Sequence, residues 1–260
     1  MNQLDATTIA TESSLNTDAV IINQCDKNSQ EDIPWNNHKI RFISSTERGL
    51  SRSRNKAIQN ATADICMLSD DDEIFTPTYS ELITTAYEDY PDADVILFQV
   101  ANSGKTYSKK PFKVGYLQSL CFASWNITFR RQSIVENNLH FDEMMGSGTG
   151  NGSGEEICFL FDCLHAGLKL QYVPITIARI ENKGESQWFH GFDALYFRNR
   201  GWATARYLGK MGALFYGLYF VIAKRNMFVH NISIIKAYNE IIKGIFEHRE
   251  KDVLGKQNLD

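Results

Sequence analysis

Short apolar runs alternate with amphipathic stretches along the first two thirds of the chain. Runs rich in β-branched residues predict strands, and apolar residues recurring every three or four positions predict helices between them. The predicted strands are 19–25, 39–43, 65–68, 94–100, 127–129 and 168–173, the last ending at Pro174. The predicted helices are 50–61, 77–90, 130–138 and 155–166. This alternation indicates an α/β fold with a Rossmann-like, mainly parallel sheet flanked by helices.

Beyond Pro174 the pattern becomes helical and rich in aromatic residues. We therefore expect an α/β domain at 1–185 and a helical C-terminal region at 186–260. The latter contains an uncharged run, 211–223, which is too short to cross a bilayer, since that takes about 20 residues. Segment 210–225 has cations at both ends, which is typical of peripheral contact with an anionic membrane face. A buried helix or a dimer contact explains the apolar run equally well.

Composition narrows the class of protein. The 260 residues are 43% hydrophobic, enough for one sizeable core with a helical appendage. The net charge of -4 argues against a nucleic-acid binder. Five scattered cysteines without a Cys-x-x-Cys pair indicate buried thiols, and the polar first 18 residues do not resemble a secretory signal. Both features favour the cytoplasm.

Four acids, Asp70, Asp71, Asp72 and Glu73, directly follow the predicted strand 65–68. Open α/β sheets place their ligands at this end of the strands. Mutual repulsion among the acids is best relieved by a cation, and their hard oxygen atoms suit Mg²⁺ or Mn²⁺. The alternative is a solvated acidic turn that caps the next helix.

A glycine-dense loop, 146–154, leads into the predicted helix 155–166. Five of its nine residues are glycine, which is typical of a lid or of a close backbone approach to a ligand, and also of a flexible linker. The helix begins with Glu155 and Glu156. Two acids at a helix N-terminus are also explained by the helix dipole alone.

Three segments resemble family 2 glycosyltransferases of the GT-A fold, such as those of bacterial capsule and exopolysaccharide synthesis. The first, 49–57 (GLSRSRNKA), is similar to the family's Ala-Arg-Asn segment, and 65–77 (ICMLSDDDEIFTP) is similar to its Asp-x-Asp motif. In the family a proline stands five residues after the last Asp, so Pro77 selects Asp70 and Asp72. The third, 154–167, resembles the family's Glu-Asp helix. The resemblance covers roughly residues 19–175.

The resemblance implies an inverting, metal-dependent transfer of a sugar from a nucleotide-diphosphate sugar to a hydroxyl of a glycan or lipid-linked acceptor, in surface polysaccharide synthesis. It assigns Mn²⁺ or Mg²⁺ to Asp70 and Asp72, and the donor to Asp26, Arg54, Asp70 and Asp71. Glu156 takes the position of the family's catalytic base, an Asp there, and adds one methylene. Glu155 beside it positions the acceptor or the helix start.

Two features depart from the family. Its first strand has no counterpart after Met1, so we expect the native reading frame to begin upstream. Downstream of the third segment, His190 is a candidate metal ligand and Trp188 a candidate for stacking on a sugar. The alternative for each is a structural role in the core. Two other classes stay open: a catalytically silent binding module, and a nucleotidyltransferase, whose usual glycine-rich basic signature is missing. A homo-oligomer also stays open for the leading interpretation.

Overall fold

The computed structural model describes residues 3, 5–181 and 191–249, which form two compact units. The first, here the α/β unit, comprises the described residues of Met1–Glu47, Arg52–Phe141 and Phe159–Glu185. The second, here the helical unit, comprises those of Arg48–Ser51, Asp142–Cys158 and Ser186–Asp260.

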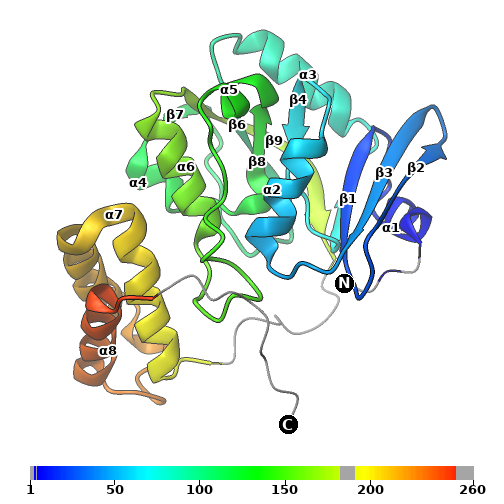
Figure 1. The fold of residues 1–260 in the computed structure, drawn as a ribbon. Helices are drawn as coiled ribbons and strands as arrows, with labels where there is room; N and C mark the ends of the chain where they lie inside the picture. The colour runs from blue at the N-terminus through cyan, green and yellow to red at the C-terminus, as the bar shows by residue number, and fades with distance from the viewer. Residues whose placement is uncertain (1–2, 4, 182–190, 250–260) are drawn as a thin grey trace. The chain divides into compact units, whose positions relative to one another are not determined.

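The strands of the α/β unit form two sheets (Figure 1). The smaller has the order β1-β3-β2, formed by β1 (Ala19–Gln24), β3 (His38–Ser45) and β2 (Ser29–Trp35). The larger has the order β4-β8-β6-β9-β5, formed by β4 (Ile65–Met67), β8 (Ile127–Arg130), β6 (Val95–Ala101), β9 (Leu170–Ile180) and β5 (Glu73–Phe75), and β7 (Phe112–Val114) also pairs with β9.

The α/β fold is confirmed, and the strand pairing is mixed rather than mainly parallel. Parallel pairs join β1 to β3 and β6 to β9. The other pairings among the described strands are antiparallel. Strand β2 runs against β3, strand β8 runs against both of its neighbours, and the short β5 and β7 run against β9. Within the described residues β1 pairs only with β3, and β4 only with β8. A further strand upstream stays a prediction.

Helices surround these strands. They are α1 (Ala6–Glu12), α2 (Leu50–Asn60), α3 (Tyr79–Asp89), α4 (Tyr116–Ser119), α5 (Arg131–Glu136), α6 (Glu155–His165) and the 3-10 turn η1 (Ser124–Asn126). Strand β6 separates two cores: Val95 and Leu97 pack with residues of α6, and Ile96 and Phe98 pack with residues of α3. Burial on both faces explains why this strand reads as one continuous apolar run.

Strand β9 continues through Pro174, where the sequence predicted its end. Its pairing with β6 passes from Leu97 opposite Tyr172 to Gln99 opposite Thr176, so β9 carries extra residues at this point. Pro174 lies inside this irregularity, where the ladder needs no N–H donor. The strand therefore resumes and reaches the turn that carries the acids.

The helical unit contains α7 (Ala194–Ala223), the 3-10 turn η2 (Arg225–Met227) and α8 (Ile234–Phe246). Gly209 breaks α7 with a φ of 67°. The two helices touch at glycines: a Cβ atom added at Gly201 would lie 2.1 Å from the carbonyl oxygen of Ile241. None of the described helices is both long and apolar enough to cross a membrane.

Candidate active site

Asp70, which follows β4, is held by groups from three other segments. Arg54 of α2 donates from Nη2 to Oδ1 (3.1 Å), and Ser124 of η1 donates from Oγ to Oδ2 (3.1 Å). The Asp70 N–H donates to Oε1 of Glu73 (2.8 Å). The Arg54 side chain is only 8% exposed, whereas that of Asp70 is 29% exposed. A buried guanidinium therefore orients a carboxylate that stays open to solvent.

Glu73 supports this turn from inside the protein. The residue is 2% exposed at the start of β5. Burial raises the pKa of its carboxyl well above the ordinary value, and the charges of Asp70 and Asp72 add to that, against the opposing effects of the Asp70 N–H and Arg54. Sequence analysis gave Glu73 no role beyond the acidic run, and no local signal marked Ser124. Both hold Asp70.

The two remaining acids of the run differ in exposure. Asp71 is exposed and Asp72 is half-buried. The main-chain oxygen of Asp72 accepts a hydrogen bond from the N–H of Glu181 (2.9 Å), just beyond β9. The turn is thus anchored at Asp70 through side chains and at Asp72 through the main chain.

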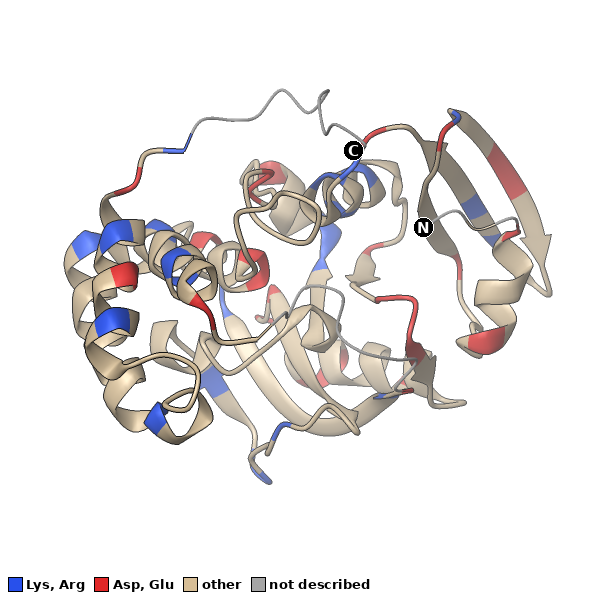
Figure 2. Ribbon diagram, turned by 90° about the horizontal axis from the view of Figure 1, so that it is seen from below, with Lys and Arg blue, Asp and Glu red and all other residues tan. Residues whose placement is uncertain are grey.

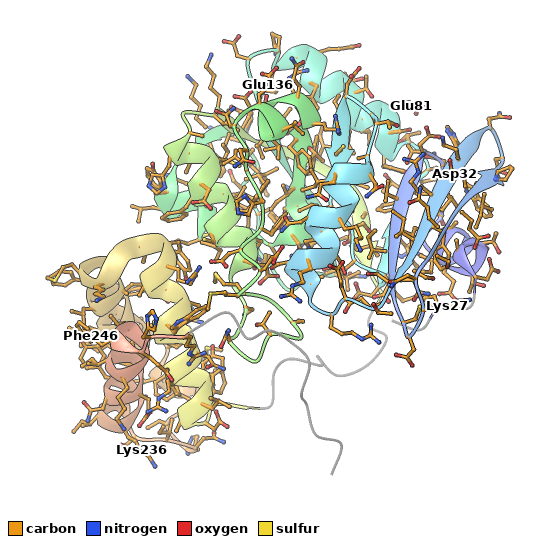
Figure 3. All side chains as sticks on the ribbon, in the orientation of Figure 1. Lys27, Asp32, Glu81, Glu136, Lys236 and Phe246 are labelled. Atoms are coloured by element: carbon orange, nitrogen blue, oxygen red, sulfur yellow. The ribbon has the colours of Figure 1, made fainter. Side chains whose placement is uncertain are left out.

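Asp26 is exposed in the turn after β1, next to Lys27 (Figure 3). Gln24, at the end of β1, donates from Nε2 to Oγ of Ser53 (3.1 Å). Ser53 and Arg54 are consecutive residues of α2, so one helix ties both the Asp26 turn and the Asp70 turn. The structure thereby brings these predicted donor-site segments to the same helix.

The acids fit a hard divalent cation in their chemistry. Asp70 and Asp72 offer carboxylate oxygens, the ligands that Mg²⁺ and Mn²⁺ take alongside the oxygens of a substrate diphosphate. No group of three or more His, Cys, Asp or Glu side chains suited to a metal occurs in the part of the chain that the structure describes. His190 and Trp188 lie outside the described residues.

The predicted catalytic pair opens α6 in the helical unit. Glu155 is 4% exposed and accepts a hydrogen bond from the N–H of Gly154 at Oε2 (3.0 Å). A Cβ atom at Gly146 would lie 3.2 Å from the Glu155 side chain, so the loop lies close to this carboxylate. Glu156 is half-buried, and its charge helps burial to raise the pKa of Tyr207 to about 12.

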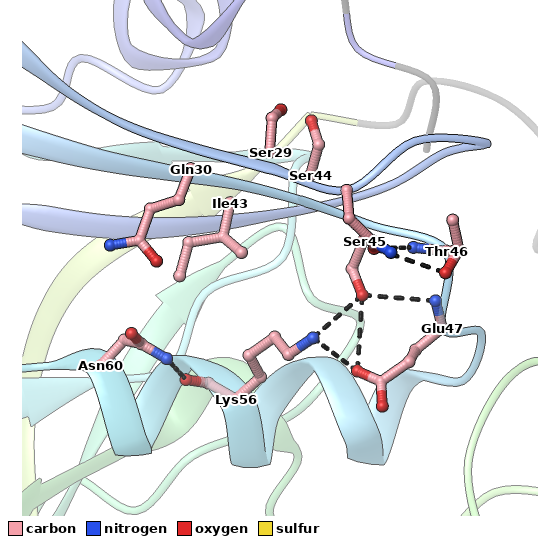
Figure 4. A pocket seen from close by; sticks show the side chains of 10 residues that line it. Ser29, Gln30, Ile43, Ser44, Ser45, Thr46, Glu47, Lys56 and Asn60 are labelled. Carbon is pink, nitrogen blue, oxygen red and sulfur yellow. Dashed lines mark hydrogen bonds and ion pairs between the residues drawn. The ribbon is translucent and has the colours of Figure 1, made fainter.

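A separate pocket of ≈ 590 Å³ lies between the small sheet and α2 (Figure 4). Lys56 there donates to Glu47 (2.5 Å) and to Oγ of Ser45 (3.0 Å). Asp26, Arg54 and Asp70 do not line this pocket. We assign the donor site to the Asp70 turn rather than to this pocket, since the acidic turn and Arg54 lie outside the pocket's lining.

Comparisons with known proteins bear on the fold and on the family of the chain. The sequence profile described as "Glycosyl transferase family 2" matches residues 12–149, slightly more than half of the chain. The crystal structure of S. aureus TarS 1-349 is similar with a TM-score of 0.58 at 13% identity, covering 87% of this chain and 71% of that one. Its complex with UDP-GlcNAc is similar with a TM-score of 0.61 at 15% identity, covering 87% and 72%.

At this identity the likeness to TarS establishes the fold. No curated protein sequence matches the chain. The family assignment rests on the profile, whose match includes both α2 and the acidic turn and ends before Glu155. The chain belongs to glycosyl transferase family 2.

Proposed function

We propose that this glycosyltransferase is inverting and metal-dependent, and that it moves a sugar from a nucleotide-diphosphate sugar to an acceptor hydroxyl. The observation that carries the proposal is the Asp70 carboxylate, which Arg54 and Ser124 orient while it stays open to solvent. Holding a charged group in place before the substrate arrives is what donor binding and transition-state stabilisation require.

On the donor side, Arg54 offers its planar guanidinium to a phosphate or a base edge. Asp70 lies nearest the ribose of the nucleotide in this proposal. Asp26 and Asp71, which are both exposed, are the other polar side chains that contact the donor. The link from Gln24 to Ser53 supports this assignment, because it ties the Asp26 turn to the helix that carries Arg54.

Asp70 and Asp72 are the residues that would hold Mn²⁺ or Mg²⁺. When bound, such an ion neutralises the charge that develops on the departing nucleoside diphosphate. The carboxylates supply oxygen ligands. Before an ion binds, the positive charge of Arg54 on Asp70 offsets part of the repulsion between the two carboxylates.

For the transfer itself we assign the base to Glu156. Its carboxylate takes the proton of the acceptor hydroxyl while that oxygen forms a bond to the anomeric carbon. The bond from this carbon to the diphosphate breaks on the opposite face, so the configuration inverts. Glu155 is a positioning residue, because its buried carboxylate holds Gly154 at the end of the glycine loop.

The acceptor we propose is a glycan or a lipid-linked glycan of a surface polysaccharide. Segment 210–225 makes peripheral contact with the inner face of the cell membrane in this account. The TarS complex contains UDP-GlcNAc, which makes UDP sugars the first donors to test. The nucleobase and the sugar of the donor follow from that test.

A panel assay tests the proposal. The protein is incubated with UDP, GDP and TDP sugars, with Mn²⁺ or with EDTA, and release of the nucleoside diphosphate is measured, with water accepting the sugar in place of the glycan. We expect release from at least one donor with Mn²⁺ and a return to background with EDTA. Nucleotide binding without release from any donor would favour the silent binding module instead.

A further inference from the structure

One face of α7 exposes apolar side chains that its own unit leaves uncovered. The buried positions after the break at Gly209 include Ala213, Phe220 and Val221. The exposed large apolar residues of the same stretch are Met211, Phe215, Leu218, Tyr219 and Ile222. Spacings of three and four residues place them on one side of the helix. Phe215 is 70% exposed, which is unusual for a side chain of this size.

Cations outnumber acids in the sequence around this face. Residues 194–239 contain seven Lys or Arg and no Asp or Glu, in a chain whose net charge is -4. Figure 2 shows the C-terminal helices, on the left, with more blue positions than red. The basic stretch is therefore a local feature, opposite in sign to the protein as a whole.

Cations lie at both ends of the apolar face. Lys210 precedes it, and Lys224 and Arg225 follow it, all of them exposed. Within the described residues none of these three forms an ion pair, whereas Arg206 on the same helix pairs with Asp142. Lys210 instead has its Nζ 5.4 Å from the centre of the Phe246 ring, which is itself 58% exposed.

We propose that this face of α7 docks onto a bilayer surface that contains anionic phospholipid. The apolar side chains enter the boundary between head groups and acyl chains, and Lys210, Lys224 and Arg225 contact the lipid phosphates. A second copy of the chain is a poorer occupant, since a two-fold contact between these faces brings the flanking cations of the two copies together.

This inference deepens the proposed function by naming the surface on which a lipid-linked acceptor is met. Vesicle binding needs no donor and no metal, so the vesicle experiment and the transfer assay can give opposite results. If release of nucleoside diphosphate persists while vesicle binding is absent, only the membrane proposal is overturned.

Vesicle flotation tests it, with phosphatidylcholine alone and with a mixture of phosphatidylcholine and phosphatidylglycerol. We expect the protein to float with the anionic vesicles, and high salt to weaken this. The double variant Lys224→Gln/Arg225→Gln should lower the partition coefficient about twenty-five-fold, at about fivefold for each cation. Phe215→Ser/Ile222→Ser should lower it by about tenfold for each side chain removed from the interface.

Matched controls lie in the α/β unit. Lys109→Gln/Lys110→Gln removes two adjacent exposed cations, and Leu117→Ser removes a side chain that is 77% exposed. Both should float as the wild type does. Equal losses in test and control variants, or no flotation of the wild type, would overturn the proposal. So would a dimer in sedimentation velocity that Phe215→Ser/Ile222→Ser converts to monomer while flotation is unchanged.

Discussion

At the scale of single residues, the site depends on how Asp70 is held. Each of its carboxylate oxygens accepts from a different segment, one from α2 and one from η1. Arg54 also has its guanidinium 5.4 Å from the ring centre of Phe141. The guanidinium plane is thus fixed on two sides, and a lysine ammonium cannot reproduce that arrangement.

Arg54→Lys should therefore weaken nucleotide binding. Loss of one hydrogen bond to a charged group costs about 1.5–3 kcal/mol, so we expect Kd for UDP or GDP, measured by calorimetry with Mn²⁺, to rise about tenfold to a hundredfold. Arg52→Lys, on the same helix, is the control and should leave Kd within a factor of about two. An unchanged Kd in Arg54→Lys would remove Arg54 from the donor site.

Glu73 gives a prediction about stability. Glu73→Gln keeps an oxygen that accepts the Asp70 N–H, whereas Glu73→Leu leaves that N–H without this acceptor, at a cost of about 1–3 kcal/mol. In EDTA and near neutral pH we expect the Tm of Glu73→Gln to equal or exceed that of the wild type, and that of Glu73→Leu to fall below it. The reverse order would contradict the role of Glu73.

The pH dependence of Glu73 has a defined sign. Because burial raises its pKa in the folded state, the stability that this carboxyl contributes is fully present below the unfolded pKa. That contribution is lost as the pH rises through the folded pKa. Glu73→Gln cannot titrate, so its stability relative to the wild type should increase as the pH rises from about 4.5. Thermal unfolding at a series of pH values measures this difference.

At the scale of elements, the close approach of α7 and α8 predicts that a glycine-to-alanine substitution in a helix lowers the stability of the protein instead of raising it. Gly→Ala inside a helix ordinarily stabilises by about 0.5–1 kcal/mol. Gly201 is helical, yet its Cβ would meet the carbonyl of Ile241. We therefore expect Gly201→Ala to destabilise the protein in denaturant unfolding.

Gly209→Ala is the comparison, because its φ is left-handed and nothing lies within 4 Å of an added Cβ. At φ 67° and ψ 168° the backbone conformation is essentially restricted to glycine, so the change should cost about 1–3 kcal/mol through strain alone, less than Gly201→Ala costs. A gain in stability for Gly201→Ala would show that the helices do not touch there.

Sequence patterns recovered the elements whose burial is one-sided or complete. The helices 50–61 and 155–166 and the strand 94–100 occur within two residues of their predicted ends. Strand β2 was missed because it is an exposed hairpin strand with the polar run Gln30-Glu-Asp32 and no apolar alternation. Strand β5 was missed because its first residue, Glu73, counted as part of the acidic run.

The candidate site was predictable in part, for a related reason. Motif spacing identified Arg54 and Asp70, which the structure joins directly. Ser124 was not predictable, since it reaches Asp70 only because η1 immediately precedes β8, the neighbour of β4 in the sheet. Local patterns do not encode such long-range pairing.

At the scale of the whole molecule, the proposed donor residues belong to the α/β unit and the proposed base, Glu156, belongs to the helical unit. Donor binding and base catalysis should therefore be impaired separately by substitutions in the two units. Asp72→Asn removes a proposed metal ligand, so it should weaken binding of UDP or GDP in Mn²⁺ by about tenfold or more and have little effect in EDTA. Calorimetry in both buffers measures the difference. Equal losses in the two buffers would argue against a metal at Asp72.

The central claim is that Glu156 acts on the acceptor and the acids act on the donor. The most direct test measures nucleotide Kd and the rate of nucleoside diphosphate release in one preparation of Glu156→Gln, with the donor that the panel identifies. We predict a Kd close to that of the wild type and a rate lower by about a hundredfold or more, since general-base catalysis contributes about 10²–10⁴. A rate close to that of the wild type would contradict the account.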